Sequence, residues 1–409
     1  AVSLYKEVVS IGVAAGADLV LIETMSDSYE LKAAVLAAKE AGIDPKTGER
    51  LPIFATVIYD EKGKLLTGGN VESTVALLEG LGVDVLGINC GLGPEQMKDI
   101  LADILKVSST PVLVNPNAGL PRSENGKTVY DVDPEDFAAV MEEIVKMGAV
   151  VTGGCCGTTP DHIRAMVELT KDIPVQLPQK KHRTVISSYS QAVVFDKKTI
   201  IIGERINPTG KSKFKQALRD HDLEYILREG VTQQDNGADV LDVNVGLPEI
   251  DEPSMMEDVV KELQAVIDLP LQLDTSSAEA MERGLRVYNG KPLINSVNGK
   301  KEVMEQIFPL VAKYAGKLET SERNPIFTNK NRRAQMQDCG LVEGSRFFTA
   351  LPEAFVSGMR QAPEPLSATV FRVQESQVDA LCHSGVIGMP FLLILFLPYL
   401  AAIVVLPQG

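Results

Sequence analysis

Short apolar runs alternate with helical stretches along the first part of the chain, and this alternation limits the fold more than any other feature. The runs cover residues 19–23, 53–59, 85–90, 112–117 and 149–154, and polar residues follow or end them. Because parallel strands need a crossover connection that is usually a helix, the repetition predicts a parallel sheet. Polar groups at the carboxyl ends of such strands are typical of the rim of a (β/α) barrel.

A second series of the same kind covers residues 199–206, 240–245, 269–275 and 292–297. The sequence therefore predicts an α/β fold with two TIM-type (β/α)8 barrels, both incomplete, with about five strands of the first and four of the second. We expect a first barrel at 1–175, a linker at 176–197, a second barrel at 198–315 and an anomalous tail at 316–409. The rim of the second barrel would carry Glu204, Asn207, Asp242, Asn244, Asp274 and Asn295.

The tail differs in character from the rest of the chain. Residues 386–407 are almost wholly apolar, which is long enough for a membrane span. Pro390, Pro398 and Pro407 interrupt the run, however, and prolines in a spanning helix need compensating partners. A membrane is therefore not expected as a partner, and a reading-frame change is the simpler origin of the tail.

Three cysteines stand at the ends of apolar runs. Cys155 and Cys156 are adjacent between glycines, and Cys90 ends an earlier run. Three soft ligands leave one position of a tetrahedral zinc ion open, which is typical of a catalytic site. Thr159-Pro160 and Gly93-Pro94 predict helix starts directly after the cysteines, and positive helix ends favour thiolates. The competing interpretation is three small buried side chains in a core.

Charge and cysteine content narrow the class of protein. Lys and Arg number 40 against 55 Asp and Glu, a net charge of −15, which argues against nucleic acid or an anionic membrane as the partner. The odd total of five cysteines and a first segment without a targeting pattern favour the cytoplasm. Cys339 and Cys382 lie in the tail and are not expected to bind the metal.

The chain resembles the cobalamin-dependent methionine synthases. The first part resembles their homocysteine-binding barrel, and the second resembles the first half of their methyltetrahydrofolate-binding barrel, whose elements are shared with other pterin-binding enzymes. The motifs that carry the resemblance are Gly87-Ile88-Asn89-Cys90-Gly91, Asn115-Pro116-Asn117-Ala118-Gly119, Gly153-Gly154-Cys155-Cys156-Gly157-Thr158 and Ile202-Gly203-Glu204-Arg205-Ile206-Asn207-Pro208-Thr209-Gly210.

For the first barrel the resemblance implies Zn²⁺ held by Cys90, Cys155 and Cys156, with the sulfur of homocysteine as fourth ligand. It also implies that Glu23 and Asn117 bind the amino-acid end of homocysteine. The competing readings are a salt bridge at a strand end for Glu23 and a turn former for Asn117. The strand that opens this barrel in the family, and the two strands after it, are not matched.

For the second barrel the resemblance implies a pterin held by Asp274 and Asn295, with the other rim residues nearby. A carboxylate can accept two parallel hydrogen bonds from the N–H pair of a pterin. Single Asp and Asn residues could equally be helix caps. No cobalamin module is evident, because His383 does not stand at the family's spacing after Asp379. Cobalamin is therefore expected on a separate domain or chain.

Three functions are left open. The leading one is methyl transfer from 5-methyltetrahydrofolate, through a corrinoid, to zinc-activated homocysteine, which gives methionine. A second is a zinc-dependent homocysteine methyltransferase with another methyl donor, such as S-methylmethionine. The third is a non-catalytic truncated fragment or gene artefact, since open barrels would expose strand edges.

Overall fold

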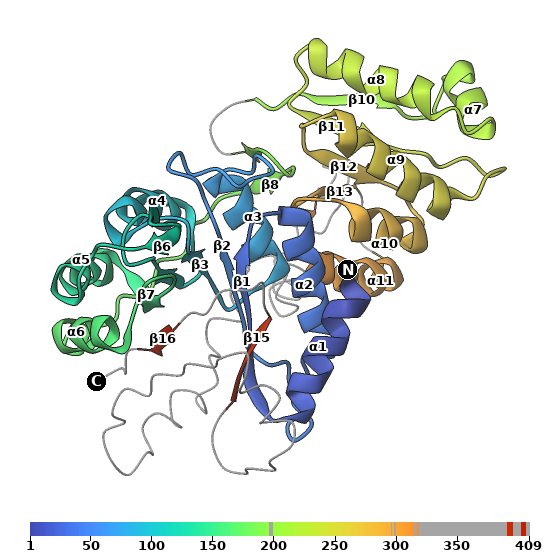
Figure 1. Cartoon of the computed structure of the whole chain (residues 1–409). Helices are drawn as coiled ribbons and strands as arrows, with labels where there is room; N and C mark the ends of the chain where they lie inside the picture. The colour runs from blue at the N-terminus through green and yellow to red at the C-terminus, as the bar shows by residue number, and fades with distance from the viewer. Residues whose placement is uncertain are drawn as a thin grey trace. The chain divides into compact units, whose positions relative to one another are not determined.

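The computed structural model describes residues 1–195, 199–295, 297 and 300–314, and the backbones of three short strands at 317–318, 391–395 and 402–405. The chain divides into two compact units (Figure 1). Unit 1 contains residues 1–71, 83–181 and 353–409, and unit 2 contains residues 72–82 and 182–352.

Unit 1 is built on a sheet whose central strands follow one another in chain order. The strands are β1 (Ala17–Met25), β2 (Ile53–Val57), β3 (Val85–Asn89), β4 (Val112–Asn115) and β7 (Ala149–Gly154), and each is parallel to the next. The backbone of β15 (Phe391–Leu395) pairs with β1, and that of β16 (Ala402–Val405) pairs antiparallel with β7. The predicted α/β fold with a parallel sheet is confirmed, and all five expected strands are present.

Helices connect these strands. They are α1 (Val2–Ala14), α2 (Ser28–Ala41), α4 (Pro94–Val107), α5 (Pro134–Met147) and α6 (Pro160–Thr170); residues 72–82, which include most of α3 (Val71–Leu81), group with unit 2. The predicted helix starts are confirmed, because Gly93 precedes α4 and Thr159 precedes α6, each with proline at the first turn. Both helices therefore begin within a few residues of the cysteines.

One face of the unit 1 sheet carries an apolar layer followed by a polar one. Leu19, Leu21, Phe54, Val85, Leu113 and Val151 form a buried cluster. Side chains two residues further along a strand point to the same face. Glu23, Thr56, Asn89 and Asn115 thus follow the apolar layer toward the carboxyl ends of the strands, and all four are buried.

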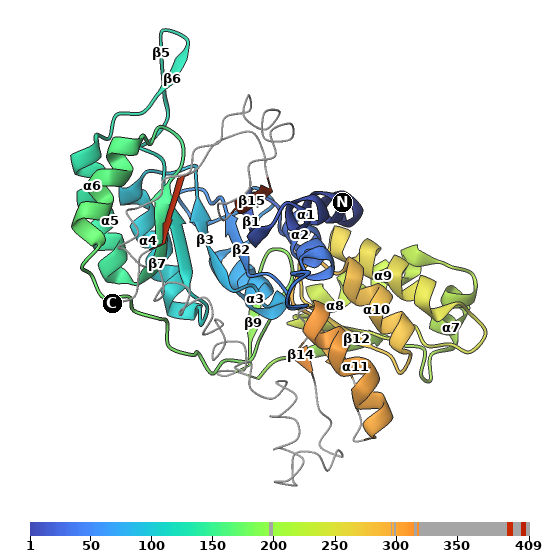
Figure 2. The same cartoon turned by 90° about the horizontal axis from the view of Figure 1, so that it is seen from below.

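A hairpin leaves unit 1 between β4 and α5. Its strands are β5 (Arg122–Glu124) and β6 (Lys127–Val129), and it projects from the body of the unit (Figure 2). All its residues except Val129 are exposed. The sequence analysis did not predict these strands, because three-residue strands without apolar alternation give no periodic signal.

Unit 2 also contains a parallel sheet in chain order. The strands are β10 (Ile202–Ile206), β11 (Val240–Val243), β12 (Leu271–Asp274), β13 (Leu293–Asn295) and β14 (Lys317–Leu318). Its helices are α7 (Ser212–Arg219), α8 (Leu223–Asp235), α9 (Glu252–Val266), α10 (Ala278–Val287) and α11 (Lys301–Tyr314), and α8 to α11 lie alongside the sheet (Figure 1). The four strands expected here are all present.

The segment expected to be a linker contains a second hairpin. Strands β8 (Val185–Ser187) and β9 (Ala192–Val194) pair antiparallel. The hydroxyl of the fully buried Tyr288 donates a hydrogen bond to the carbonyl of Ser187 and accepts one from the amide of Leu271, which begins β12. Ile186 packs with Val240 and Leu293. The hairpin therefore packs at the amino ends of the unit 2 strands.

The structure leaves parts of the prediction untested. Among the residues searched, those that the structure describes, there is no helix with the length and hydropathy of a membrane span. The apolar run at 386–407 lies outside the described residues, apart from the backbones of β15 and β16. Cys339 and Cys382 lie outside them as well.

Candidate functional site

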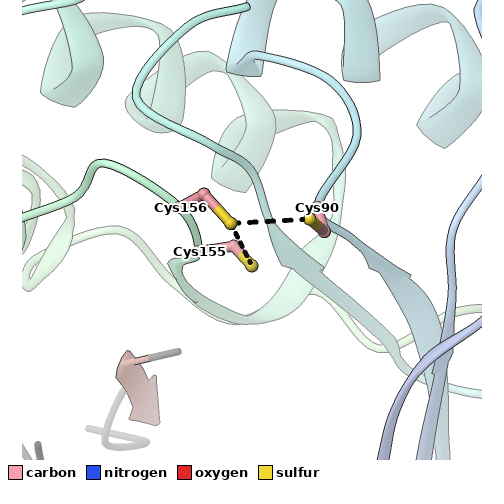
Figure 3. Close-up of side chains that lie close together, drawn as sticks. All are labelled: Cys90, Cys155 and Cys156. Carbon is pink, nitrogen blue, oxygen red and sulfur yellow. Dashed lines mark hydrogen bonds between the residues drawn. The ribbon is translucent and has the colours of Figure 1, made fainter. Parts of the chain in front are cut away.

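The three predicted cysteines come together in unit 1, beyond the carboxyl ends of β3 and β7. The sulfur of Cys156 lies 3.7 Å from that of Cys90 and 3.9 Å from that of Cys155 (Figure 3). The three sulfurs all lie within 4.8 Å of one another. Cys155 is buried, while Cys90 and Cys156 are partly exposed, so solvent reaches two of the three residues.

The backbone at Cys90 is turned into an uncommon conformation. Cys90 has a φ of 61°, in the left-handed region, and Gly91 follows with a φ of 73°. A non-glycine residue there costs about 1 to 2 kcal/mol and persists only where its surroundings hold it. The amide of Cys90 donates to the carbonyl of Asn115 at 3.1 Å, which ties this turn to β4.

Residues 115–119 hold both cysteine loops. The amide of Cys155 donates to the carbonyl of Pro116 at 2.7 Å, and the amide of Ala118 donates to the carbonyl of Cys156 at 2.9 Å. The side-chain oxygen of Asn117 accepts from the amide of Cys156 at 3.0 Å. One short segment thus fixes the positions of loops that are 65 residues apart in the chain.

The sulfurs share negative charge unevenly. Hydrogen bonds from Cys155 and Cys90 lower the pKa of Cys156 to about 3, so this residue is a thiolate at neutral pH. The hydrogen bond with Cys156 raises the pKa of Cys155, so that thiol keeps its proton in the metal-free chain. The close approach of the three sulfurs therefore favours negative charge within the cluster.

The spacing of the sulfurs fits a tetrahedral metal ion. Zinc–sulfur bonds of about 2.3 Å place two sulfur ligands about 3.8 Å apart. The two shorter separations in the cluster are close to this value. Three thiolates also match the preference of zinc for soft ligands and leave one tetrahedral position open.

Asn89 connects the polar layer to the cysteines. It is fully buried, and its side-chain oxygen accepts from the hydroxyl of Thr56 at 2.7 Å and from the amide of Thr24 at 3.0 Å. Its side-chain nitrogen donates to the hydroxyl of Thr24 at 2.6 Å and lies 3.8 Å from the sulfur of Cys155. Asn89 therefore joins β1, β2 and β3 beneath the cluster.

Glu23 lies in the same layer. Its side chain is 4% exposed, and its Oε1 has no hydrogen-bond partner among the described residues. Burial raises its pKa to about 7, the nearby side chain of Asn115 opposes the shift, and the negative charge of Cys156 adds to it. Both side-chain atoms of Asn115 also lack a partner in the described part of the chain. Buried polar groups without partners are uncommon and suit a polar ligand.

Asn117 is 2% exposed, and its side-chain oxygen is already used by the amide of Cys156. Asn117 is therefore more than a turn former, because its side chain also holds the loop that carries Cys156.

In unit 2, three of the six predicted rim residues come together. Asp274 and Asn295 are paired neighbours at the ends of β12 and β13. The side-chain nitrogen of Asn244 donates to Oδ2 of Asp274 at 2.9 Å. Burial raises the pKa of Asp274. These groups form a half-buried polar cluster at the carboxyl ends of the strands.

The other three rim residues have different surroundings. Asp242 is buried and accepts from the side chain of Gln272 at 2.5 Å. Asn207 accepts from the amide of Thr209, two residues further on, as in an Asx turn. Glu204 is exposed and forms an ion pair with Lys211 at 3.0 Å. Its charge nevertheless contributes to the raised pKa of Asp274, after burial.

Sequence reasoning gave no role to Asn89 or Asn115, although both belong to the motifs that carry the resemblance. Each asparagine ends an otherwise apolar strand. Because a buried amide needs a hydrogen-bond partner, this position could have indicated a role for both residues.

Sequence comparisons give relatives for most of the chain. It is 34% identical over 286 residues to a protein named methionine synthase from Mycobacterium tuberculosis. It is 35% identical over 291 residues to a protein of the same name from Mycobacterium leprae. Each match covers 69% of this chain and 24% of the relative. The chain thus spans about a quarter of the length of these curated relatives.

Two family descriptions match separate parts of the chain. Residues 1–170 match the family described as Homocysteine S-methyltransferase, and residues 203–337 match Pterin binding enzyme. Among solved structures, the apo form of the homocysteine methyltransferase MmuM from Escherichia coli is 25% identical, over 41% of this chain and 58% of that one. The TM-score is 0.33, too low to carry a structural argument.

Proposed function

Since residues 1–170 match the homocysteine S-methyltransferase family and residues 203–337 match the pterin-binding enzymes, we propose that this chain is part of a methionine synthase. In this proposal a methyl group passes from 5-methyltetrahydrofolate, through a corrinoid on another domain or chain, to homocysteine. Unit 1 would be part of the homocysteine barrel and unit 2 part of the folate barrel. The reaction would take place in the cytoplasm, where thiols stay reduced.

The observation that carries the proposal is the convergence of Cys90, Cys155 and Cys156 within 4.8 Å. These residues would hold zinc, which when bound supplies a deprotonated homocysteine sulfur at neutral pH. Metal binding would displace the protons that the three cysteines still hold.

The polar layer beside the cysteines would hold the amino-acid end of homocysteine. Glu23 has an unpartnered carboxylate oxygen that can accept from the ammonium group, and Asn115 has an amide that can donate to the carboxylate. Asn117 would act mainly by holding Cys156, and its side-chain nitrogen can still donate to the ligand.

In unit 2, Asp274 would accept two hydrogen bonds from the N–H pair of the pterin, with Asn295 beside it. Asn244 would orient the Asp274 carboxylate. Methyl transfer needs reacting atoms about 3 to 3.5 Å apart, so one methyl group cannot be handed directly between two separate sites. A mobile carrier is therefore implied.

Zinc content tests the proposal. The full chain should bind one zinc, and Cys156→Ser should bind less than about a tenth as much, because a hydroxyl is a poor replacement for a thiolate. Cys339→Ser is the matched control and should keep its zinc. Equal zinc in the Cys156→Ser variant would refute the metal centre. The intact chain should also bind homocysteine. If Cys156→Ser loses its zinc but the intact chain binds no homocysteine, the non-catalytic alternative is favoured.

A further inference from the structure

Tyr130 lies at the metal centre although neither the motifs nor the predicted rim includes it. It follows β6 directly and is partly exposed. Its ring packs against Gly157: a Cβ placed on that glycine would lie 2.4 Å from Cγ and 2.5 Å from Cδ2 of the ring. Gly157 also has a φ of 81°, so its left-handed turn and its missing side chain both bring the ring beside Cys156.

The ring of Tyr130 lies close to the cysteines. It packs on the residue that follows Cys156 in the chain. In keeping with this position, burial and the negative charge of Cys156 raise the pKa of Tyr130 to about 12. The ring therefore covers the turn directly after one of the three cysteines.

His162 fixes the segment that carries Tyr130. The amide of Thr159 donates to Nδ1 of His162 at 3.2 Å, so Nδ1 is an acceptor and the proton is on Nε2. Nε2 then donates to the carbonyl of Val132 at 2.9 Å. The ring of His162 is buried and lies edge-to-face on Phe137, with centroids 5.4 Å apart.

Backbone hydrogen bonds continue this path to the cluster. The amide of Val132 donates to the carbonyl of Ala118 at 3.1 Å, and the amide of Ala118 donates to the carbonyl of Cys156 at 2.9 Å. The segment after the hairpin is thus held on one side by α6 and on the other by residues 115–119. Tyr130 has a fixed position although the hairpin before it is exposed.

We propose that Tyr130 is a positioning residue of the metal centre: its ring packs on the Gly157 turn and holds the loop that carries Cys156. The inference rests on the proposed function, since it assigns the residue to the zinc site. Groups outside the coordination sphere that orient metal ligands typically change metal affinity 10- to 100-fold.

The first experiment measures zinc affinity of the full chain by competition with a chelator. Tyr130→Ala removes the ring, so its dissociation constant for zinc should rise about tenfold. Tyr130→Phe keeps the ring and should bind zinc as the unmodified chain does. Tyr189→Ala, in the turn of the β8–β9 hairpin, is the matched control and should also leave zinc affinity unchanged. A dissociation constant of Tyr130→Ala within twofold of the unmodified chain would overturn the proposal.

The second experiment needs no metal. In the metal-free chain, the rate at which iodoacetamide alkylates Cys156 is measured by mass spectrometry. Tyr130→Ala removes the ring and should raise this rate several-fold, while an unchanged rate would contradict the covering role whether or not zinc binds. If the unmodified chain binds no zinc, the proposed function fails, and the alkylation rates still decide the placement of Tyr130.

Discussion

The side-chain oxygen of Asn117 accepts a 3.0 Å hydrogen bond from the backbone amide of Cys156. Both residues are at the carboxyl edge of the unit 1 sheet, and Asn117 is almost fully buried. A side chain expected to bind substrate therefore also supports the metal centre, because it sets the position of one ligand loop.

Replacement of Asn117 separates these two roles. Asn117→Ala leaves the amide of Cys156 without its acceptor, and zinc affinity should fall at least tenfold. Asn117→Asp keeps an acceptor oxygen and should restore most of the affinity. The measurement is zinc competition on both variants. Equal affinity in all three proteins would show that the hydrogen bond does not position the loop.

Glu23 should give the chain a characteristic pH dependence in its metal-free form. Its pKa is raised by burial from 4.5 to about 7, so the unfolded chain loses this proton first as the pH rises. The free energy of unfolding should therefore fall between about pH 4.5 and 7, by about 3 kcal/mol at most. Glu23→Gln should remove this fall. Urea unfolding at pH 5 and pH 8 measures it, with Glu61→Gln, at an exposed position, as control. The same pH dependence in Glu23→Gln would contradict the assignment.

Asp274 should matter for folate and not for homocysteine. Removing an acceptor of charge-assisted hydrogen bonds costs about 1.5 to 3 kcal/mol, so Asp274→Ala should bind methyltetrahydrofolate at least tenfold more weakly. Asp235→Ala, at the exposed end of α8, is the control. Calorimetric titration with each ligand checks this. Unchanged folate affinity, or equal loss for both ligands, would count against a pterin contact.

Gly87 should be intolerant of any side chain. A Cβ there would lie 1.9 Å from the carbonyl oxygen of Leu113 in the adjacent strand, so Gly87→Ala must push β3 and β4 apart. We expect a loss of about 3 kcal/mol in unfolding free energy. Gly16→Ala is the matched control: it meets no atom within 4 Å and should cost only about 1 kcal/mol for its left-handed φ. Urea unfolding curves compare the two, and equal losses would contradict the steric explanation.

The strands and the cysteine cluster could be predicted because each depends on local pattern. Apolar runs with polar ends located β1 to β4 and β7, and glycines around Cys155 and Cys156 indicated a turn at the strand end. Asp274 and Asn295 were also expected at one rim, and strand pairing brings them side by side.

The remaining features depend on tertiary contacts that no local pattern encodes. Tyr130 reaches the cysteines through a hydrogen-bond path that includes His162, 32 residues later in the sequence. The left-handed conformation of Cys90 is accompanied by a hydrogen bond to Asn115 in the neighbouring strand. The β8–β9 hairpin is held by Tyr288, about a hundred residues away in the chain. Composition alone suggested an irregular linker there.

The β8–β9 hairpin is attached to one end of the unit 2 sheet. Ser187 is hydrogen-bonded to Tyr288 and to Lys291, both of which precede β13, while Asn295 ends that strand. The hairpin is thus fastened at the amino end of the unit 2 sheet. A change of length in its turn can therefore be absorbed at the end of the sheet that lies away from the predicted rim residues.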